Sequence, residues 1–145
     1  KTTVEALGTL PHLNSLEIEA SGSFPVGLLL KAPSLYVLSV ICADEMFWME
    51  DGDAEELGAA IANSKTLNVL NLEPFISAKR GLSIILKGLE LYNRSLETFQ
   101  FSCIPSTPEE GEDALEVLAM ALESNTSLRA VWNEVYESWA TCKTT

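Results

Sequence analysis

The sequence predicts one α/β domain in which strands and helices alternate along the chain. The first observation is an apolar pattern, L-x-x-L-x-L with other apolar residues allowed, which begins at residues 13, 35, 67, 96 and 128. The second is that the last three residues of its first four copies alternate apolar, polar and apolar, the period of a β-strand. The third is that apolar residues at helical spacing precede three of the copies.

Each copy of the pattern predicts a strand. The starts lie 22, 32, 29 and 32 residues apart, so the strands recur about once in 30 residues. The predicted strands are Leu13–Ile18, Leu35–Val40, Leu67–Leu72, Leu96–Phe101 and a decayed copy, Leu128–Asn133.

Three helices are predicted in front of the last three strands. Leu57, Leu86 and Leu118 each lie ten residues before the first leucine of the following strand. This constant register is expected if each helix packs on its own strand and on its neighbours. Acidic runs at 51–56 and 109–113 place carboxylates at or just before first helical turns, where the helix dipole favours them.

The first part of the chain predicts shorter elements. Thr3–Leu10 is long enough for a helix of about two turns. Between the first two strands, Pro25 and Pro33 leave room for little more than one helical turn. The stretch CADEMFWMEDGD, residues 42–53, is predicted to be a loop that joins the second strand to the next helix.

Strand, loop and helix units of this length resemble the leucine-rich repeats of ribonuclease-inhibitor-like proteins. The resemblance is best over about residues 50–133, with junctions such as SNTSLRAV, whereas 1–49 resembles more irregular repeats. It implies a single leucine-rich-repeat domain over 1–145, either complete or part of a longer chain. The implied shape is a curved solenoid with about five parallel strands on the concave side and helices on the convex side.

One departure from the repeat family is visible in the sequence. The family usually places Asn or Cys eight residues after the first leucine of each unit, where these side chains form a buried ladder. The residues at these positions here predict irregular turns after the strands, and they are Ser21, Ala43, Phe75, Ile104 and Tyr136.

Composition narrows the classes of partner. The chain is 47% apolar and 21% charged, as expected of a folded globular protein, and its net charge is −12. Because so acidic a surface repels phosphate backbones, we expect no nucleic-acid partner. The longest apolar stretches are far shorter than the roughly 20 residues of a membrane helix, so we expect no membrane span.

The cysteines and the single histidine predict no metal site and no cofactor. Cys42, Cys103 and Cys142 form no CxxC pair, and His12 is the one histidine. Cys42 and Cys103 are predicted to lie two strands apart, about 10 Å, which is too far for a disulfide. Scattered reduced thiols indicate a cytoplasmic or other reducing intracellular compartment.

No catalytic arrangement is evident, so we do not expect an enzyme. His12 is the one available imidazole base, and no glycine-rich phosphate loop is present. The repeat family includes a group of GTPase activators, which implies a third function with Arg80, Arg94 or Arg129 as candidates. The sequons at Asn93 and Asn125 indicate glycosylation or, as we favour, turn chemistry at helix ends, where Asn tolerates a left-handed conformation.

These exclusions leave a non-catalytic protein–protein interaction module whose partner is another protein. The competing hypothesis is a structural subunit of a large assembly, held by its ends, where another subunit stacks, and by the aromatic loop at 42–53 rather than by its concave face. Strand residues two, four and six positions after each first leucine are expected on the concave side. They are Ser15, Glu17, Glu19, Val37, Ser39, Ile41, Val69, Asn71, Glu73, Thr98, Gln100, Ser102, Ala130, Trp132 and Glu134.

Within this strip we expect Val37, Ile41 and Val69 to form an apolar centre, with Asn71 and Gln100 beside it and Trp132 as an anchor. Trp132 is equally open to burial by a further repeat or by Tyr136 and Trp139. Phe47 and Trp48 are a second candidate contact, because the predicted loop 42–53 places large apolar residues among carboxylates. That loop is alternatively a local cap over the thin second unit.

Overall fold

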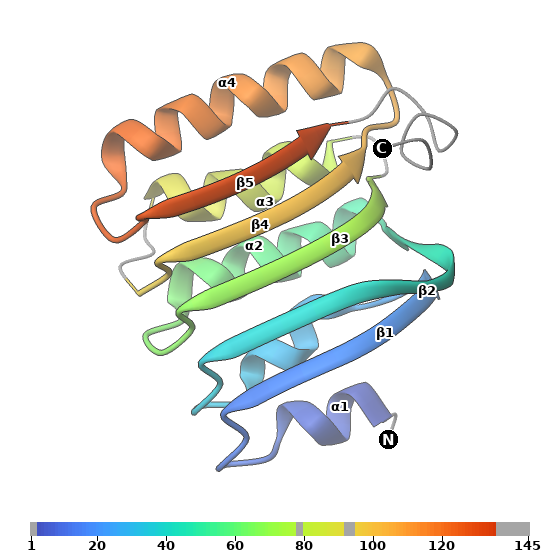
Figure 1. Ribbon diagram of the computed structural model, residues 1–145, viewed down its shortest axis with the longest axis vertical. Coiled ribbons are helices and arrows are strands. Elements are labelled where there is room, and N and C mark those ends of the chain that lie inside the picture. Colours follow the sequence, from blue (N-terminus) through green and yellow to red (C-terminus); the bar gives the residue numbers. More distant parts are fainter. Residues whose placement is uncertain (1–2, 78–79, 92–94, 136–145) are drawn as a thin grey trace.

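A parallel sheet of five strands forms one layer of the fold. The computed structural model describes residues 3–77, 80–91 and 95–135. The strands follow one another across the sheet in sequence order, so that β1 and β5 form its edges (Figure 1). The strands are β1 (Ser15–Ser23), β2 (Val37–Met49), β3 (Val69–Ser77), β4 (Thr98–Ile104) and β5 (Ala130–Val135).

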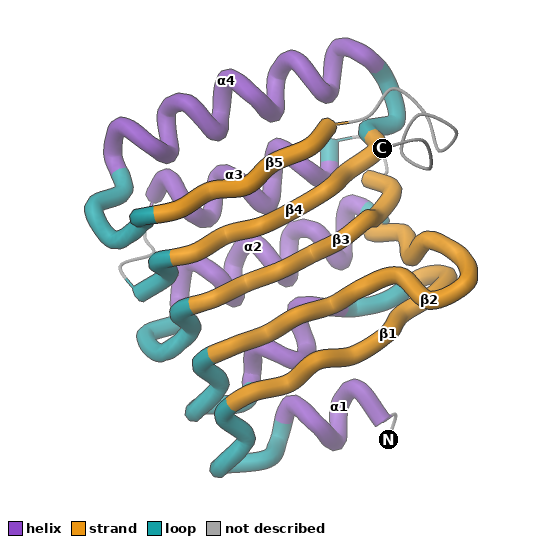
Figure 2. The backbone as a smooth tube through the Cα atoms, in the orientation of Figure 1, coloured by secondary structure: helices purple, strands orange, loops and turns teal. Residues whose placement is uncertain are grey.

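The helices form the second layer, and all of them lie on the same face of the sheet (Figure 2). Each packs against the next along the chain, from α1 through η1, α2 and α3 to α4. The connection between β1 and β2 is a 3-10 helix, η1, as its two flanking prolines predict. The helical elements are α1 (Thr3–Gly8), η1 (Val26–Lys31), α2 (Asp51–Asn63), α3 (Gly81–Leu91) and α4 (Pro108–Ser124).

The core lies between the two layers and is built from the leucines of the repeated pattern. Leu38, Leu70 and Phe99 are fully buried on neighbouring strands, and Leu38 and Leu70 are partners in the ladder, as are Leu70 and Phe99. Leu57 and Leu86 face them from α2 and α3 with no exposed surface. The constant spacing between helix and strand leucines therefore reflects a shared packing register.

Strand β2 runs much further than the sequence pattern predicts. The expected loop at 42–53 is wrong: the strand continues to Met49, with a register shift between Ile41 and Phe47. Phe47 stacks on Phe75 with ring centroids 5.7 Å apart and an interplanar angle of 18°. It also meets the edge of Phe24 at 6.4 Å. Burial of these rings keeps the chain in the sheet beyond the shift.

The curved ribonuclease-inhibitor-like solenoid predicted from the sequence is also wrong, because the chain forms a compact α/β domain. A regular solenoid requires equal units, whereas these units connect their strands by helices of 6, 13, 11 and 17 residues. The positions of the expected polar ladder hold Phe75 and Ile104, which are buried strand residues. Apolar packing thus extends the strands where the repeat family would turn the chain.

The acidic runs act at helix starts, as predicted. The Thr107 side chain caps α4 by accepting a hydrogen bond from the backbone N–H of Glu110. The buried Glu110 carboxylate accepts from the backbone N–H of Leu82, in the first turn of α3, and from the backbone N–H and hydroxyl of Ser106. One carboxylate therefore links the first turns of two neighbouring helices.

Candidate functional site

The face of the sheet opposite the helices carries the candidate binding surface, which we call the open face. Its side chains alternate with those of the core along every strand. The ladder pairs place them in straight rows across the strands. Among the side chains that the structure describes, the open face consists of Ser15, Glu17, Glu19, Val37, Ser39, Ile41, Val69, Asn71, Glu73, Thr98, Gln100, Ser102, Ala130 and Trp132. The side chain of Glu134, the remaining residue of the predicted strip, lies outside this description.

One row crosses the whole sheet through its polar centre. Successive ladder pairs join Glu17 of β1, Ser39 of β2, Asn71 of β3, Gln100 of β4 and Trp132 of β5. The Glu17 end is exposed, the three central side chains are half-buried, and Trp132 is 67% exposed. The row therefore presents a carboxylate at one edge of the sheet and an indole ring at the other.

Apolar side chains lie on both sides of this row. Val37 and Val69 are ladder partners, and Ile41 lies further along β2 between Glu19 and Glu73. All three apolar side chains are half-buried although none of the described helices covers this face. The polar pair of Ser39 and Asn71 therefore lies between the Val37–Val69 pair and Ile41.

Hydrogen bonds hold the central amides in place. Asn71 Nδ2 donates to Ser39 Oγ at 3.2 Å, and Gln100 Nε2 donates to Glu73 Oε1. Asn71 Oδ1 is buried and accepts no hydrogen bond from the part of the chain that the structure describes. Such an unsatisfied buried acceptor costs about 1–3 kcal/mol of stability.

The aromatic pair predicted in the 42–53 stretch is divided between core and surface. Phe47 is fully buried against Phe75 and presents no surface to a partner. Trp48 is 53% exposed and pairs with Ser23 and Ile76 beyond the register shift. The alternation of the strand separates the two neighbours, which a loop would have left on the same side.

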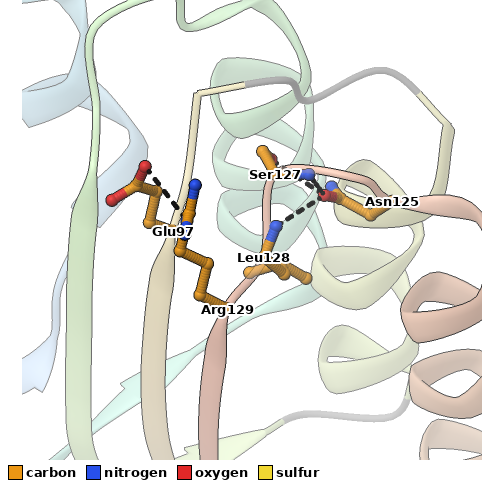
Figure 3. A network of polar contacts seen from close by, with 5 residues as sticks. All are labelled: Glu97, Asn125, Ser127, Leu128 and Arg129. Atoms are coloured by element: carbon orange, nitrogen blue, oxygen red, sulfur yellow. Dashed lines mark hydrogen bonds and ion pairs between the residues drawn. The ribbon is translucent and has the colours of Figure 1, made fainter.

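A polar side chain stabilises the turn that leads from α4 into β5. Asn125 Oδ1 accepts from the backbone N–H of Ser127 and of Leu128, at 2.8 and 3.0 Å (Figure 3). Its Nδ2 donates to the carbonyl of Leu89 at 2.9 Å. With the side chain 6% exposed, this Asn is a turn residue, as favoured from the sequence. Its φ of −84° is not the left-handed value that the sequence suggested.

The described arginines among the candidates for GTPase activation, Arg80 and Arg129, lie outside the open face. Arg129 Nε lies 3.5 Å from Glu97 Oε1 at the start of β4 and β5 (Figure 3). Arg80 lines two shallow depressions of about 450 and 420 Å³ between the helices. Arg94 lies outside the described residues, as do Asn93, Tyr136, Trp139 and Cys142.

Residues with metal-binding or thiol chemistry do not converge in the described ranges. No group of three or more His, Cys, Asp or Glu side chains there is placed to hold a metal ion. Burial raises the pKa of the Cys42 thiol, and the charge of Glu19 adds to the rise, so this thiol stays protonated at neutral pH. Among the described helices, none combines the length and apolar character needed to cross a membrane.

Comparison with known proteins defines the fold class. No protein-family model and no curated protein matches the sequence. The structure is similar to the tropomodulin C-terminal domain from Caenorhabditis elegans, with a TM-score of 0.67 and 21% identity over 98% of this chain and 88% of that one. It is also similar to a structure described as Leiomodin-1 Actin-Binding Site 2, with a TM-score of 0.67 and 17% identity over 97% of this chain and 82% of that one.

This finding corrects the resemblance inferred from the sequence. The solved structures that share the fold are tropomodulin and leiomodin domains, so ribonuclease-inhibitor-like leucine-rich repeats are the wrong family. The chain is accordingly described as an α/β domain of the tropomodulin C-terminal type, and not as a repeat protein or solenoid. At 21% and 17% identity the likeness extends to the fold alone.

Sequence reasoning missed part of this surface. The strip positions included Glu17 and Glu73, but neither was singled out as a site residue. The alternation along each strand already placed both residues on the same face as the named site residues. Two features could not be predicted from a local pattern: the contact between Gln100 and Glu73, and the unsatisfied oxygen of Asn71. Both depend on side-chain geometry across strands that are about 30 residues apart in sequence.

Proposed function

We propose that this chain is a non-catalytic domain that binds another protein through the open face. The single observation that carries the proposal is Trp132, which is 67% exposed at the end of a registered row of half-buried polar side chains. Tryptophan is the residue type most enriched at the energetic centres of protein interfaces. Val37, Ile41 and Val69 add an apolar surface that a partner would desolvate.

Actin is the partner that we propose to test first. The similar leiomodin structure is described as an actin-binding site, and it covers 97% of this chain. A shared fold does not transfer a binding site between proteins of 17% identity. The proposal for this chain therefore depends on its own open face, and actin supplies a defined protein with which to examine it.

Binding to monomeric and filamentous actin tests this function directly. The 145-residue chain should bind one of the two forms, and Trp132→Ala should weaken that binding at least tenfold, because truncating an interface tryptophan typically costs 2 kcal/mol or more. Leu122→Ala is the matched control, since Leu122 is 51% exposed on α4, in the helix layer. No binding to either form would overturn the assignment to actin. Equal losses in both variants would overturn the open face as the surface.

A structural subunit of a larger assembly is the second candidate. It is favoured by Leu115 and Leu122, which are 44% and 51% exposed and lie seven residues apart on α4, the last described helix. Such a subunit would contact its neighbour through α4 and the edge of β5. A Leu115→Ser/Leu122→Ser variant should then lose its partner while Trp132→Ala keeps it, which is the reverse of the result expected for the open face.

A further inference from the structure

We propose that the open face recognises a partner segment carrying a cation and an aromatic or apolar side chain about 19 Å apart, the cation at β1 and the apolar group at β5. The inference rests on the proposed function, because it takes the open face to be the binding surface. It adds the chemistry of the partner and the direction in which its segment crosses the sheet.

The spacing follows from the row that runs from Glu17 to Trp132. Four ladder steps separate the two residues, and each pair in the row is in direct register. Neighbouring strands lie about 4.8 Å apart, which places β1 and β5 about 19 Å from each other. Six residue steps of an extended chain, at about 3.3 Å each, cover this distance.

Among the open-face side chains that the structure describes, the exposed carboxylates lie on β1. Glu17 and Glu19 are exposed on β1, whereas Glu73 in the centre already accepts the Gln100 amide. None of the described open-face residues is a lysine or arginine. Arg129, which directly precedes β5, has its guanidinium beside Glu97. The β1 edge therefore attracts a cation, and each exposed ion pair contributes up to about fivefold in affinity.

The opposite edge favours an apolar group. Trp132 presents most of its indole ring to solvent. Its ladder partner is Gln100, and the adjacent ladder pair is Thr98 with Ala130. Stacking or apolar contact with this ring would bury the largest exposed hydrophobic side chain of the described residues.

The centre of the row is polar and half-buried, and it consists of Ser39, Asn71 and Gln100. A segment that crosses the strands would pass over these three side chains. Its cation would meet the carboxylates at β1, and its apolar group would meet the indole at β5.

Two synthetic peptides of identical composition test the spacing. Both are nine residues long and hold one Arg and one Trp among Ser and Gly, with five residues between Arg and Trp in the first and none in the second. Titrated into the isotope-labelled 145-residue chain, the spaced peptide should bind at least fivefold more tightly. It should also shift the NMR signals of the Trp132 indole N–H and the Glu17 amide. Equal affinities, or shifts centred on α4, would overturn the inference.

Charge exchange tests the direction. Glu17→Lys/Glu19→Lys should weaken binding of the spaced peptide at least fivefold and should improve binding of the same peptide with Glu in place of Arg. Glu112→Lys/Glu116→Lys is the matched control, because it makes the same charge change on exposed residues of α4. An equal effect of both variants would show attraction by net charge alone and would overturn the site.

The outcomes separate this inference from the proposed function. If Trp132→Ala abolishes actin binding while the two peptides bind equally, the open face is a binding surface but the proposed partner chemistry is wrong. If neither actin nor the spaced peptide responds to Trp132→Ala, both proposals fail.

Discussion

Asn125 illustrates how a single side chain shapes the junction of helix and strand. Its side-chain oxygen, Oδ1, accepts hydrogen bonds from two backbone N–H groups and from the Ser127 hydroxyl, and its side-chain Nδ2 donates to the carbonyl of Leu89. These contacts turn the chain from α4 into β5 and tie it to the end of α3. The residue is polar, buried and satisfied, which is the condition under which burial of an amide is tolerated.

Asn125→Ala should lower the free energy of unfolding by about 2–4 kcal/mol, because it leaves buried backbone groups without partners. Urea denaturation followed by circular dichroism measures the loss. Thr126→Ala, an exposed change in the same turn, should stay within about 0.5 kcal/mol. Similar values for the two variants would contradict the role assigned to Asn125.

Asn71 presents the opposite case, a buried oxygen without a donor in the described part of the chain. Asn71→Leu removes this oxygen and should raise the free energy of unfolding by about 1 kcal/mol, since the apolar surroundings include Val69 and Ile41 on the same face. The same change should weaken binding at the open face. Asn133→Leu, at an exposed position of β5, should do neither. Destabilisation by Asn71→Leu would contradict a net cost of the Asn71 amide, whose Nδ2 bond to Ser39 is lost in the same variant.

At the scale of elements, a close approach between helices sets the spacing of the outer layer. A Cβ added at Gly88 of α3 would lie 2.4 Å from the carbonyl oxygen of Gly58 on α2, which is backbone and cannot move aside. The two helices therefore touch through glycine. Without a side chain at either position, the helices can pack at this short distance.

Gly88→Ala should cost about 1–3 kcal/mol because the added methyl group forces α2 and α3 apart. Gly52→Ala is the control within a neighbouring helix, because a Cβ there meets nothing within 4 Å. It should raise stability by up to about 1 kcal/mol through the higher helix propensity of alanine. Thermal unfolding of both variants supplies the comparison, and an unchanged melting temperature for Gly88→Ala would contradict the close contact.

At the scale of the whole molecule, one apolar core joins all the strands. The buried cluster extends from Ala20 on β1 to Cys103 on β4, and Val131 and Val135 of β5 pack against it. Stability is therefore shared between units that each bury their apolar side chains against the next.

Leu70→Ala and Leu118→Ala should each lower the free energy of unfolding by about 2–5 kcal/mol, because they open cavities in this core. Leu122→Ala, on the exposed side of α4, should stay within about 0.5 kcal/mol. Unfolding followed by circular dichroism and by tryptophan fluorescence should give coincident transitions. Separate transitions would indicate units that unfold independently.

Much of the local structure could be predicted from the sequence, and the reason is periodicity. Leu57, Leu86 and Leu118 were placed by spacing alone, and all three are buried. The family was not predicted correctly, because the pattern does not report how far each strand continues. Phe47 remains in the sheet through contact with Phe75, 28 positions later in the chain, and no periodic signal crosses the register shift that precedes it.

The candidate site could be predicted less completely. The alternation along each strand identified which side chains share a face, including Trp132 and Asn71. It did not distinguish Trp48 from Phe47, two neighbouring aromatic residues that lie on the surface and in the core. Whether an aromatic ring is exposed depends on the element that covers it, and the described helices all lie on one face of the sheet.

By itself the sequence determined the order of helices and strands and the face on which the leucines of the repeated strand pattern lie, because these follow from the periods of 3.6 and 2 that the backbone imposes. The tertiary structure alone decided the length of β2, the contact of α2 with α3 through glycine, and the row that joins Glu17 to Trp132. These features arise between segments distant along the chain, where packing and ladder register, and not local propensity, determine which side chains meet.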